Sequence, residues 1–284
     1  MNNILVTGGK GQLGSELSDL APNHPNYNFF FTDRSQLDIT NHAAVDAFIT
    51  KNEIDTVINC AAYTAVDKAE SEPDLANAIN HLAVANLAQI AKDKKLKLVH
   101  ISTDYVFDGR SKEPYLETDT PNPQSVYGQT KLDGELTLQR INPANSIIIR
   151  TSWVYSKYCN NFVKTMLRIA ENRDEISVVA DQIGSPTNAA DLAEAILTSL
   201  PQIKNETVEI FHYSNEGVCS WYDFAMAIFE IKKISIRVNP IKSTEYPTPA
   251  DRPFYSLLNK TKMKKHYSIE ASFWRDTLKN VLTP

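Results

Sequence analysis

A tyrosine and a lysine four positions apart are residues whose types and spacing could do chemistry. Tyr127 and Lys131 lie in SVYGQTKLDGE, residues 125–135, which has the pattern of a helix. One helical turn separates them, so their side chains share a face. Free tyrosine and lysine have pKa values of about 10 and about 10.4. A lysine ammonium beside a phenol favours tyrosinate, so this pair could transfer a proton near neutral pH. A partly exposed helix with a solvated lysine is the alternative.

A threonine at the end of an apolar run could complete this pair. Thr103 closely follows the run 98–101 and precedes the tyrosine helix in the chain. Ligands of open α/β sheets bind outside the carboxyl ends of the strands, which would place Thr103 near the reacting groups. Its hydroxyl could hold a substrate oxygen, or could instead bond to local backbone. Together, Thr103, Tyr127 and Lys131 predict an acid–base site.

A glycine-rich turn near the N-terminus predicts a dinucleotide site. Gly8, Gly11 and Gly14 follow the apolar run 4–7 and open the amphipathic stretch 12–20. Gly8 allows a tight turn, Gly11 lets the backbone approach a pyrophosphate, and Gly14 permits close helix–strand packing. The N–H groups and partial positive charge at the helix N-terminus favour phosphates. A glycine turn needed only for packing is the alternative.

The residues after the second apolar run leave the choice of cofactor open. Asp33 directly follows that run, at the distance from Gly14 that suits a hydrogen bond to a ribose 2′-hydroxyl, as in NAD sites. Arg34 follows and could accept a 2′-phosphate. The segment 37–39 could flank the adenine, although Asp38 could instead cap the next helix. We therefore expect NADPH or NADH as the cofactor.

The elements that must position these residues alternate along the first half of the chain. Apolar runs predict strands at 4–7, 29–32, 56–59, 98–101 and 146–150, and periodic stretches predict helices at 12–20, 43–51, 73–94 and around residue 127. Strands that are apolar on both faces and separated by helices predict a parallel sheet covered on both sides. With right-handed crossovers, this α/β pattern is a doubly wound Rossmann-type sheet.

The second half of the chain has a different pattern. A strand at 176–180 and a helix at 190–200 precede aromatic-rich pieces, and 244–254 is proline-rich and predicts an irregular loop. We predict a dinucleotide-binding domain over 1–150, to which later strands and helices return. The remainder, 151–284, is predicted to form mainly a smaller substrate-binding lobe.

The composition excludes several classes of protein. The 284 residues carry a net charge of −5, which argues against a nucleic-acid partner. No apolar run approaches the length of a membrane span, so we expect no membrane partner. The first residues lack the basic segment of a signal peptide, and the three cysteines have no CxxC spacing. These features favour a cytoplasmic protein with reduced thiols.

Longer motifs narrow the class further. The glycine spacing with Tyr127, Lys131 and Thr103 resembles the extended short-chain dehydrogenase/reductase superfamily. Within it, the dTDP-4-dehydrorhamnose reductase family is similar in five longer segments: CAAYTAVDKAE (60–70), STDYVF (102–107), RTSWVY (150–155), NNFVKTM (160–166) and DQIGSPT (181–187). The resemblance covers nearly the whole chain, to Arg252-Pro253 and beyond.

This resemblance implies an activity and a set of contacts. The implied reaction transfers a hydride from the nicotinamide to C4 of dTDP-4-dehydro-β-L-rhamnose, with Tyr127 protonating the alkoxide, and forms dTDP-β-L-rhamnose. Cofactor contacts carry over to Gly11, Gln12, Leu13, Asp38, Ile39, Ala62, Tyr63 and Thr64. Substrate contacts carry over to Thr103, Asp104, Trp153 and Arg252. Tyr63 replaces a histidine of some members, and Trp153 could instead belong to the core.

The resemblance also bears on metals and oligomers. Some members bind Mg²⁺ at a dimer interface through several glutamates. Glu16 matches one such position, but the stretch 188–191 lacks a glutamate where another is expected. We therefore expect no metal site, and a monomer or a weak homodimer.

Two other functions remain open. One is an NAD(P)-dependent sugar-nucleotide epimerase or dehydratase of the same superfamily. Dehydratases of this fold place an Asp-Glu pair after the threonine, whereas here Asp104 is followed by Tyr105. The other is a non-catalytic NADP-binding relative, like the regulatory subunit of methionine adenosyltransferase. The complete Thr103, Tyr127 and Lys131 set disfavours the second function, and turnover of a ketosugar nucleotide would separate the two classes.

Overall fold

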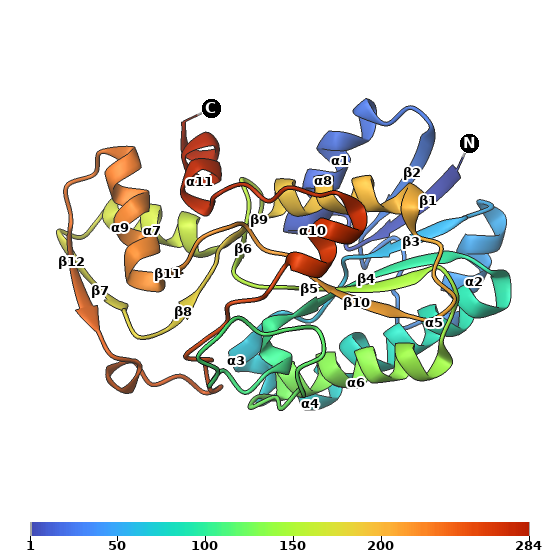
Figure 1. Ribbon diagram of the computed structural model, residues 1–284, viewed down its shortest axis with the longest axis horizontal. Helices are drawn as coiled ribbons and strands as arrows, with labels where there is room; N and C mark the ends of the chain where they lie inside the picture. The colour runs from blue at the N-terminus through green and yellow to red at the C-terminus, as the bar shows by residue number, and fades with distance from the viewer. Residues whose placement is uncertain (1, 284) are drawn as a thin grey trace.

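Six parallel strands form the central sheet of the protein, in the order β10-β5-β4-β3-β1-β2. The computed structural model describes residues 2–283 (Figure 1). The sheet strands are β1 (Asn2–Thr7), β2 (Tyr27–Thr32), β3 (Thr56–Asn59), β4 (Lys97–Thr103), β5 (Ser146–Thr151) and β10 (Glu209–His212). The predicted parallel sheet is confirmed. The strand order changes direction at β1, which places a ligand crevice at the carboxyl ends of β1 and β3.

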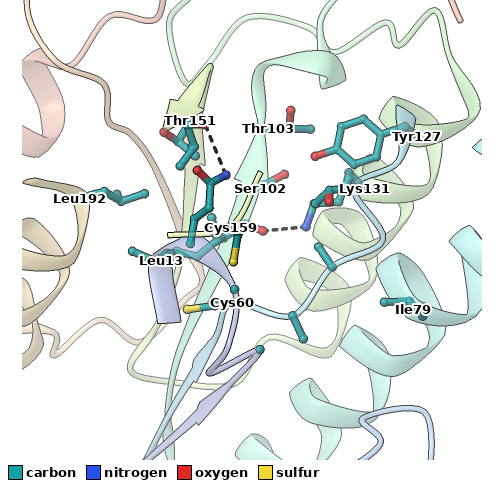
Figure 2. A pocket seen from close by; sticks show the side chains of 18 of the residues that line it. Leu13, Cys60, Ile79, Ser102, Thr103, Tyr127, Lys131, Thr151, Cys159 and Leu192 are labelled. Carbon is teal, nitrogen blue, oxygen red and sulfur yellow. Dashed lines mark hydrogen bonds between the residues drawn. The ribbon is translucent and has the colours of Figure 1, made fainter. Parts of the chain in front are cut away.

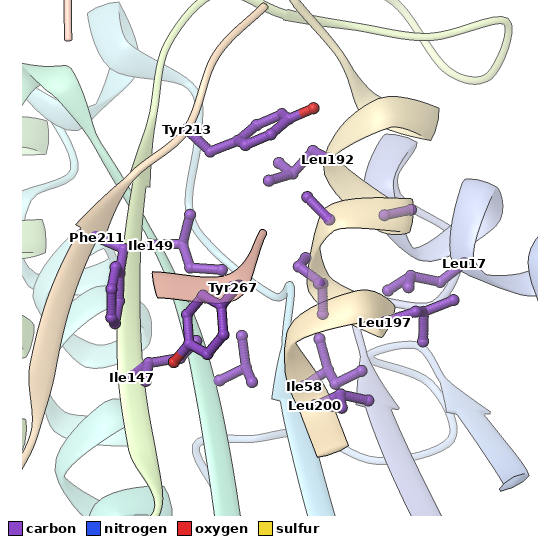
Figure 3. Close-up of a cluster of buried hydrophobic side chains, with 14 of the residues drawn as sticks. Leu17, Ile58, Ile147, Ile149, Leu192, Leu197, Leu200, Phe211, Tyr213 and Tyr267 are labelled. Carbon is purple, nitrogen blue, oxygen red and sulfur yellow. The ribbon is translucent and has the colours of Figure 1, made fainter. Parts of the chain in front are cut away.

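Helices cover both faces of the sheet, as the doubly wound prediction requires (Figure 1). One face carries α1 (Gln12–Leu20), α8 (Ala189–Ser199) and α10 (Thr261–Tyr267), and the other carries α2 (His42–Lys51), α5 (Ala83–Lys94) and α6 (Val126–Ile141). Figure 3 shows Leu17 of α1 and Leu192 of α8 in the first of these two cores. Full burial of one leucine side chain stabilises the folded state by about 1.5–3 kcal/mol.

A second, smaller lobe lies beside the sheet, at the left of Figure 1. Its larger elements are α7 (Phe162–Ala170), β7 (Glu175–Val179), α9 (Trp221–Lys232), β12 (Arg237–Ile241) and α11 (Trp274–Leu282). They enclose their own apolar cluster, which includes Phe224, Ile228 and Leu278. The predicted strand at 176–180 is confirmed as β7, which pairs in parallel with β12.

Short elements connect these parts. They are η1 (Ala21–Asn23), α3 (Val66–Ala69), η3 (Asp104–Val106), β6 (Val154–Tyr155), β8 (Ile183–Gly184), β9 (Thr187–Asn188), η4 (Leu200–Gln202), β11 (Cys219–Ser220) and η5 (Ser243–Glu245). The predicted irregular loop at 244–254 begins at the end of η5 and forms no helix or strand beyond it.

The chain crosses between the two lobes more than once. α8, β10 and α10 come from the second half of the sequence, yet they pack on or extend the central sheet. A boundary at residue 150 therefore stays a prediction, in the form in which later elements return to the first domain.

The predicted helix at 73–94 contains a widened turn in its middle. It consists of α4 (Pro73–Asn77), the π-turn η2 (Ala78–Leu82) and α5, in direct succession. The π-turn presents Asn80, whose side chain accepts from the Tyr63 N–H at 2.9 Å and donates to the Tyr63 carbonyl at 3.1 Å. It also donates to Thr130 Oγ1 of α6 at 3.3 Å. Asn80 thus holds the loop after β3 against α6.

Gly134 lets α6 approach this π-turn closely. A Cβ at position 134 would clash with the backbone carbonyl of Asn80. In an open helix, replacing glycine by alanine stabilises by roughly 0.5–1 kcal/mol. Here we expect Gly134→Ala to lower the free energy of unfolding by about 1–3 kcal/mol, the usual cost of overpacking. Chemical denaturation measures this change.

Leu136→Ala is the matched control, because Leu136 lies on the same helix and is 52% exposed. Its free energy of unfolding should stay within about 0.5 kcal/mol of the wild-type value. A Gly134→Ala variant as stable as wild type would contradict the close approach.

Candidate active site

A cavity of about 690 Å³ lies at the carboxyl ends of the central strands (Figure 2). It brings together most of the residues that the sequence singles out: Gly8, Gly11, Gln12, Leu13, Asp33, Arg34, Asp38, Ile39, Ala62, Thr64, Thr103, Asp104, Tyr127, Lys131 and Trp153. Residues from both halves of the chain therefore share one cavity.

The turn between β1 and α1 forms a cradle for an anionic group. Gly8 has φ +67°, and a Cβ there would lie 2.8 Å from the Ala61 nitrogen. Gly11 is the N-cap of α1 and offers no side-chain cap, so the first N–H groups of the helix are available to a ligand. Gly14 does not line the cavity, and a Cβ there would clash with the Gly8 carbonyl. The cradle fits a diphosphate, with Gly14 in the packing role predicted for it.

Two acidic side chains near the end of β2 are each paired with a basic one. Lys10 forms an ion pair with Asp33 and holds the pKa of that carboxyl well below its ordinary value. Arg34 pairs with Asp38 at 3.5 Å. Lys10 lines the cavity. The sequence reasoning missed it, because the choice between NADPH and NADH considered only residues after the second strand.

The start of α6 places the tyrosine and lysine in the cavity. The Ser125 hydroxyl caps the helix by accepting from the Gly128 N–H at 3.1 Å. A Cβ on Gly128 would clash with the Tyr105 carbonyl, so this glycine lets α6 pack tightly on η3. Tyr127 and Lys131 are both buried. Figure 2 shows the Tyr127 ring beside Thr103, with Lys131 below them.

Burial sets the protonation of the pair. It raises the pKa of the Tyr127 phenol, and the nearby Thr103 hydroxyl only partly opposes this. The sequence predicted a tyrosine pKa lowered by Lys131, whereas the net shift of the Tyr127 pKa is upward, because desolvation of the buried phenolate dominates. Burial also lowers the pKa of Lys131 to about 8, against the opposing charge of Glu135. Tyr127 is therefore a neutral phenol at neutral pH, which is the form that can donate a proton.

Asp104 presents one free oxygen beside Thr103. The Thr103 hydroxyl donates to Oδ1 at 3.0 Å, while the buried Oδ2 has no hydrogen-bond partner among the described residues. Burial raises the pKa of this carboxyl to about 6. Both features suit a group that meets a polar ligand in the cavity.

Trp153 forms a wall of the cavity and is held there from behind. Its backbone has φ +50°, and its ring stacks on Trp221 with centroids 3.6 Å apart and planes 12° apart. Gly184 lies against the same ring, because a Cβ there would be 2.8 Å from Trp153 Cε2. Its place in the cavity wall favours the substrate-contact prediction over a purely core role.

Two predicted contact residues do not line this cavity. The Tyr63 hydroxyl donates to Glu72 at 2.5 Å. Arg252 pairs with Asp67 at 2.6 Å and donates to the Tyr105 hydroxyl at 3.1 Å. Arg252 instead lines a second cavity of about 440 Å³, which shares Tyr105 with the first. A diphosphate contact at Arg252 stays a prediction.

Sequence reasoning missed several other lining residues: Lys10, Cys60, Ser102, Thr151, Ser152, Cys159 and Leu192. Cys60, Ser102, Thr151 and Ser152 lie at or just after strand ends, so the rule about carboxyl ends could have found them. Cys159 and Leu192 arrive from the second half of the chain, and their position depends on tertiary packing that no local pattern encodes.

The structure of residues 2–283 bears on metal binding and on membrane insertion. That part of the chain holds no group of three or more His, Cys, Asp or Glu side chains that could hold a metal ion. Glu16, which the sequence resemblance connected with a metal site, accepts a hydrogen bond from Ser156 at 2.5 Å. No described helix is long and apolar enough to cross a membrane.

A dinucleotide cradle that opens onto a buried tyrosine and lysine of one helix defines the class of the extended short-chain dehydrogenases/reductases. Within that class, the chain belongs to the RmlD substrate binding domain family, whose model matches residues 1–284. The resemblance found in the sequence motifs is thereby confirmed.

Individual relatives agree along the whole chain. A dTDP-4-dehydrorhamnose reductase of Aggregatibacter actinomycetemcomitans is 43% identical, with 99% of this chain and 98% of the relative covered. The dTDP-4-dehydrorhamnose reductase structure from Clostridium acetobutylicum has a TM-score of 0.93 at 43% identity, covering 99% and 98% of the two chains. That from Bacillus anthracis, in complex with NADP, has a TM-score of 0.93 at 40% identity and covers 99% of both chains.

The Trp153–Trp221 stack has a spectroscopic consequence. Two indoles in face-to-face contact couple their transitions, so we expect an exciton couplet in the far-ultraviolet circular dichroism. Trp221→Phe should abolish the couplet, because only one indole of the pair remains. Trp274→Phe is the control, since Trp274 packs edge-on against Phe224 and its loss should leave the couplet intact. A couplet that survives Trp221→Phe would contradict the observed stacking.

Proposed function

We propose that this chain reduces the C4 keto group of dTDP-4-dehydro-β-L-rhamnose to dTDP-β-L-rhamnose with NADPH or NADH, the last step in making this sugar donor. The supporting observation is one cavity that combines an uncapped glycine turn with Thr103, Tyr127 and Lys131. The names of the relatives that match the whole chain agree with this reaction, and the Bacillus anthracis relative binds NADP.

The cofactor would lie along the carboxyl ends of β1 and β3. Gly8, Gly11 and the first N–H groups of α1 would hold the diphosphate, and Asp33 with Lys10 and Arg34 would meet the adenosine ribose. A reduced nicotinamide, when bound, supplies the hydride. The protein's own residues bind, orient and move the proton.

Tyr127 acts as the general acid in this proposal. As the hydride adds to C4, the carbonyl electron pair moves to oxygen, and that oxygen takes the proton from Tyr127 Oη. A phenol with a raised pKa keeps its proton until a more basic alkoxide develops. Thr103 holds the same oxygen by a hydrogen bond, and the Lys131 ammonium stabilises the tyrosinate that remains.

The sugar would lie between the strand ends and the second lobe. Thr103, Asp104 and Trp153 all line this space. The second cavity begins at Tyr105 and contains Arg252, so it offers space for the rest of the nucleotide. Arg252 would then exchange part of its pairing with Asp67 for the diphosphate, since a guanidinium can hold two oxygens in its planar fork.

The alternatives fit less well. A dehydratase needs a second acid after Asp104, but that position is Tyr105, whose hydroxyl accepts from Arg252. A non-catalytic NADP-binding subunit has no need for the buried set of Thr103, Tyr127 and Lys131. A cytoplasmic location and a monomeric or weakly dimeric state complete the proposal, and three free cysteines suit a reducing compartment.

Tyr127→Phe tests the assignment of the general acid. The ring and its packing remain while one hydroxyl is lost, so cofactor binding should survive. Turnover should fall by about 10²–10⁴-fold, the usual contribution of a positioned acid. The measurement is kcat for dTDP-4-dehydrorhamnose with NADPH. Tyr222→Phe, in α9 and outside the cavity, should keep wild-type turnover. More than a tenth of wild-type turnover in Tyr127→Phe would refute the assignment.

The pairing of Lys10 with Asp33 predicts opposite effects on the two cofactors. Asp33→Ala removes the acceptor for a 2′-hydroxyl and should weaken NADH more than NADPH. Lys10→Ala removes a cation that a 2′-phosphate could recruit and should weaken NADPH more than NADH. Because Lys10 is mostly exposed, we expect a difference of roughly threefold to tenfold for this variant. Direct binding titrations decide, and equal losses for both cofactors in both variants would argue against this placement.

A further inference from the structure

Three polar residues form a row across the apolar centre of the sheet. Thr7 of β1 is paired in register with Asn59 of β3, and Asn59 with His100 of β4. All three are at most 1% exposed, as is Lys131. Their neighbours along these strands are mostly apolar and buried. A polar row in such a place is destabilising unless its members bond to one another.

The row is fully connected and ends at the catalytic lysine. Thr7 Oγ1 donates to Asn59 Oδ1 at 2.6 Å, and Asn59 Nδ2 lies 3.0 Å from His100 Nδ1. His100 Nε2 lies 3.3 Å from Lys131 Nζ. At the other end, the Ala61 N–H donates to Thr7 Oγ1 at 3.4 Å, and Ala61 lines the cavity. The row thus joins Lys131 to the cavity wall beside the glycine turn.

Two arrangements of this row are self-consistent. With Asn59 Nδ2 donating to Nδ1, a neutral His100 carries its proton on Nε2 and faces a neutral Lys131 amine. Exchanging the oxygen and nitrogen of the Asn59 amide lets His100 Nδ1–H donate to Oδ1, so that Nε2 accepts from a Lys131 ammonium and Thr7 Oγ1 accepts from Asn59 Nδ2. An ammonium is a donor only, so the charged lysine requires this second arrangement.

The surroundings give His100 a direct part in holding Lys131. The lysine also donates to the Ile101 carbonyl at 2.6 Å. On its own helix, Glu135 is engaged by Arg150 of β5 at 2.6 Å, and Tyr127 faces Thr103. Other titratable groups near the cavity are Cys60 after β3 and Asp104 after β4. Among the described residues, His100 is the side chain that hydrogen-bonds to the Lys131 amine.

We propose that Thr7, Asn59 and His100 form a positioning row that holds the Lys131 ammonium at the catalytic centre and sets the upper pH limit of turnover. This inference rests on the proposed function. His100 does not touch the substrate. It acts through Lys131, and Asn59 acts through His100.

The experiment measures kcat against pH for two variants that separate the ends of the imidazole. His100→Asn places its amide near the Nδ1 position, so this variant keeps the hydrogen bond to Asn59 and loses the one to Lys131. His100→Gln reaches the Nε2 position and keeps an acceptor for Lys131. Losing an acceptor disfavours the ammonium, so the basic limb of His100→Asn should move about one pH unit lower. The limb of His100→Gln should stay near wild type.

His212→Asn is the matched control. His212 is also fully buried, its Nδ1 bonds to the Tyr115 carbonyl, and it lies outside the cavity. His212→Asn should lose about as much stability as His100→Asn, while the basic limb of its pH profile should stay at the wild-type position. An unchanged or raised limb in His100→Asn overturns the proposal, as does an equal displacement in His212→Asn, which would reflect general loosening.

Asn59→Ala covers the case in which His100→Asn does not fold. It interrupts the row without touching Lys131, so its basic limb should move in the same direction by a smaller amount, and a wild-type limb overturns the proposal. If the wild-type chain does not reduce the ketosugar nucleotide, the proposed function fails. The row is then judged by the pH dependence of NADPH affinity, in which we expect the same displacement for His100→Asn and none for His212→Asn.

Discussion

Burial of a single lysine amine constrains the whole site. A charged amine is costly to bury without partners, so Lys131 must lie where the sheet offers acceptors. The Ile101 carbonyl and the His100 imidazole supply them near the carboxyl end of β4. This requirement fixes the position of α6 along the direction of β4. Because Tyr127 is one turn earlier on α6, the same constraint brings its hydroxyl to Thr103.

Close backbone contacts make this placement possible. Gly128 lets the first turn of α6 approach η3, and Gly134 lets its middle approach the π-turn that carries Asn80. Asn80 in turn fixes the loop after β3, which lines the cavity. The second lobe closes the remaining side through Trp153, held against Trp221. Chemistry at the strand ends therefore depends on packing from both halves of the chain.

Local patterns in the sequence predicted the parallel sheet, most of its helices and the glycine turn, because each depends on spacing within a few residues. They also singled out Thr103, Tyr127 and Lys131 as a candidate acid–base set. They did not predict the π-turn, because periodicity does not show where an Asn side chain finds a distant backbone. The net shift of the Tyr127 pKa was predicted in the wrong direction, because burial, which raises it, is a tertiary property. Lys10 was missed since its role depends on where Asp33 comes to lie.

The most direct test of the account follows one deuterium atom. NADPH labelled with deuterium at the transferring position of its nicotinamide is incubated with the chain and dTDP-4-dehydrorhamnose, and the product sugar is examined by NMR. We expect one deuterium at C4 for each cofactor oxidised, because the hydride adds to the carbonyl carbon. A product without deuterium at C4, or a changed sugar with no net cofactor oxidation, would contradict it.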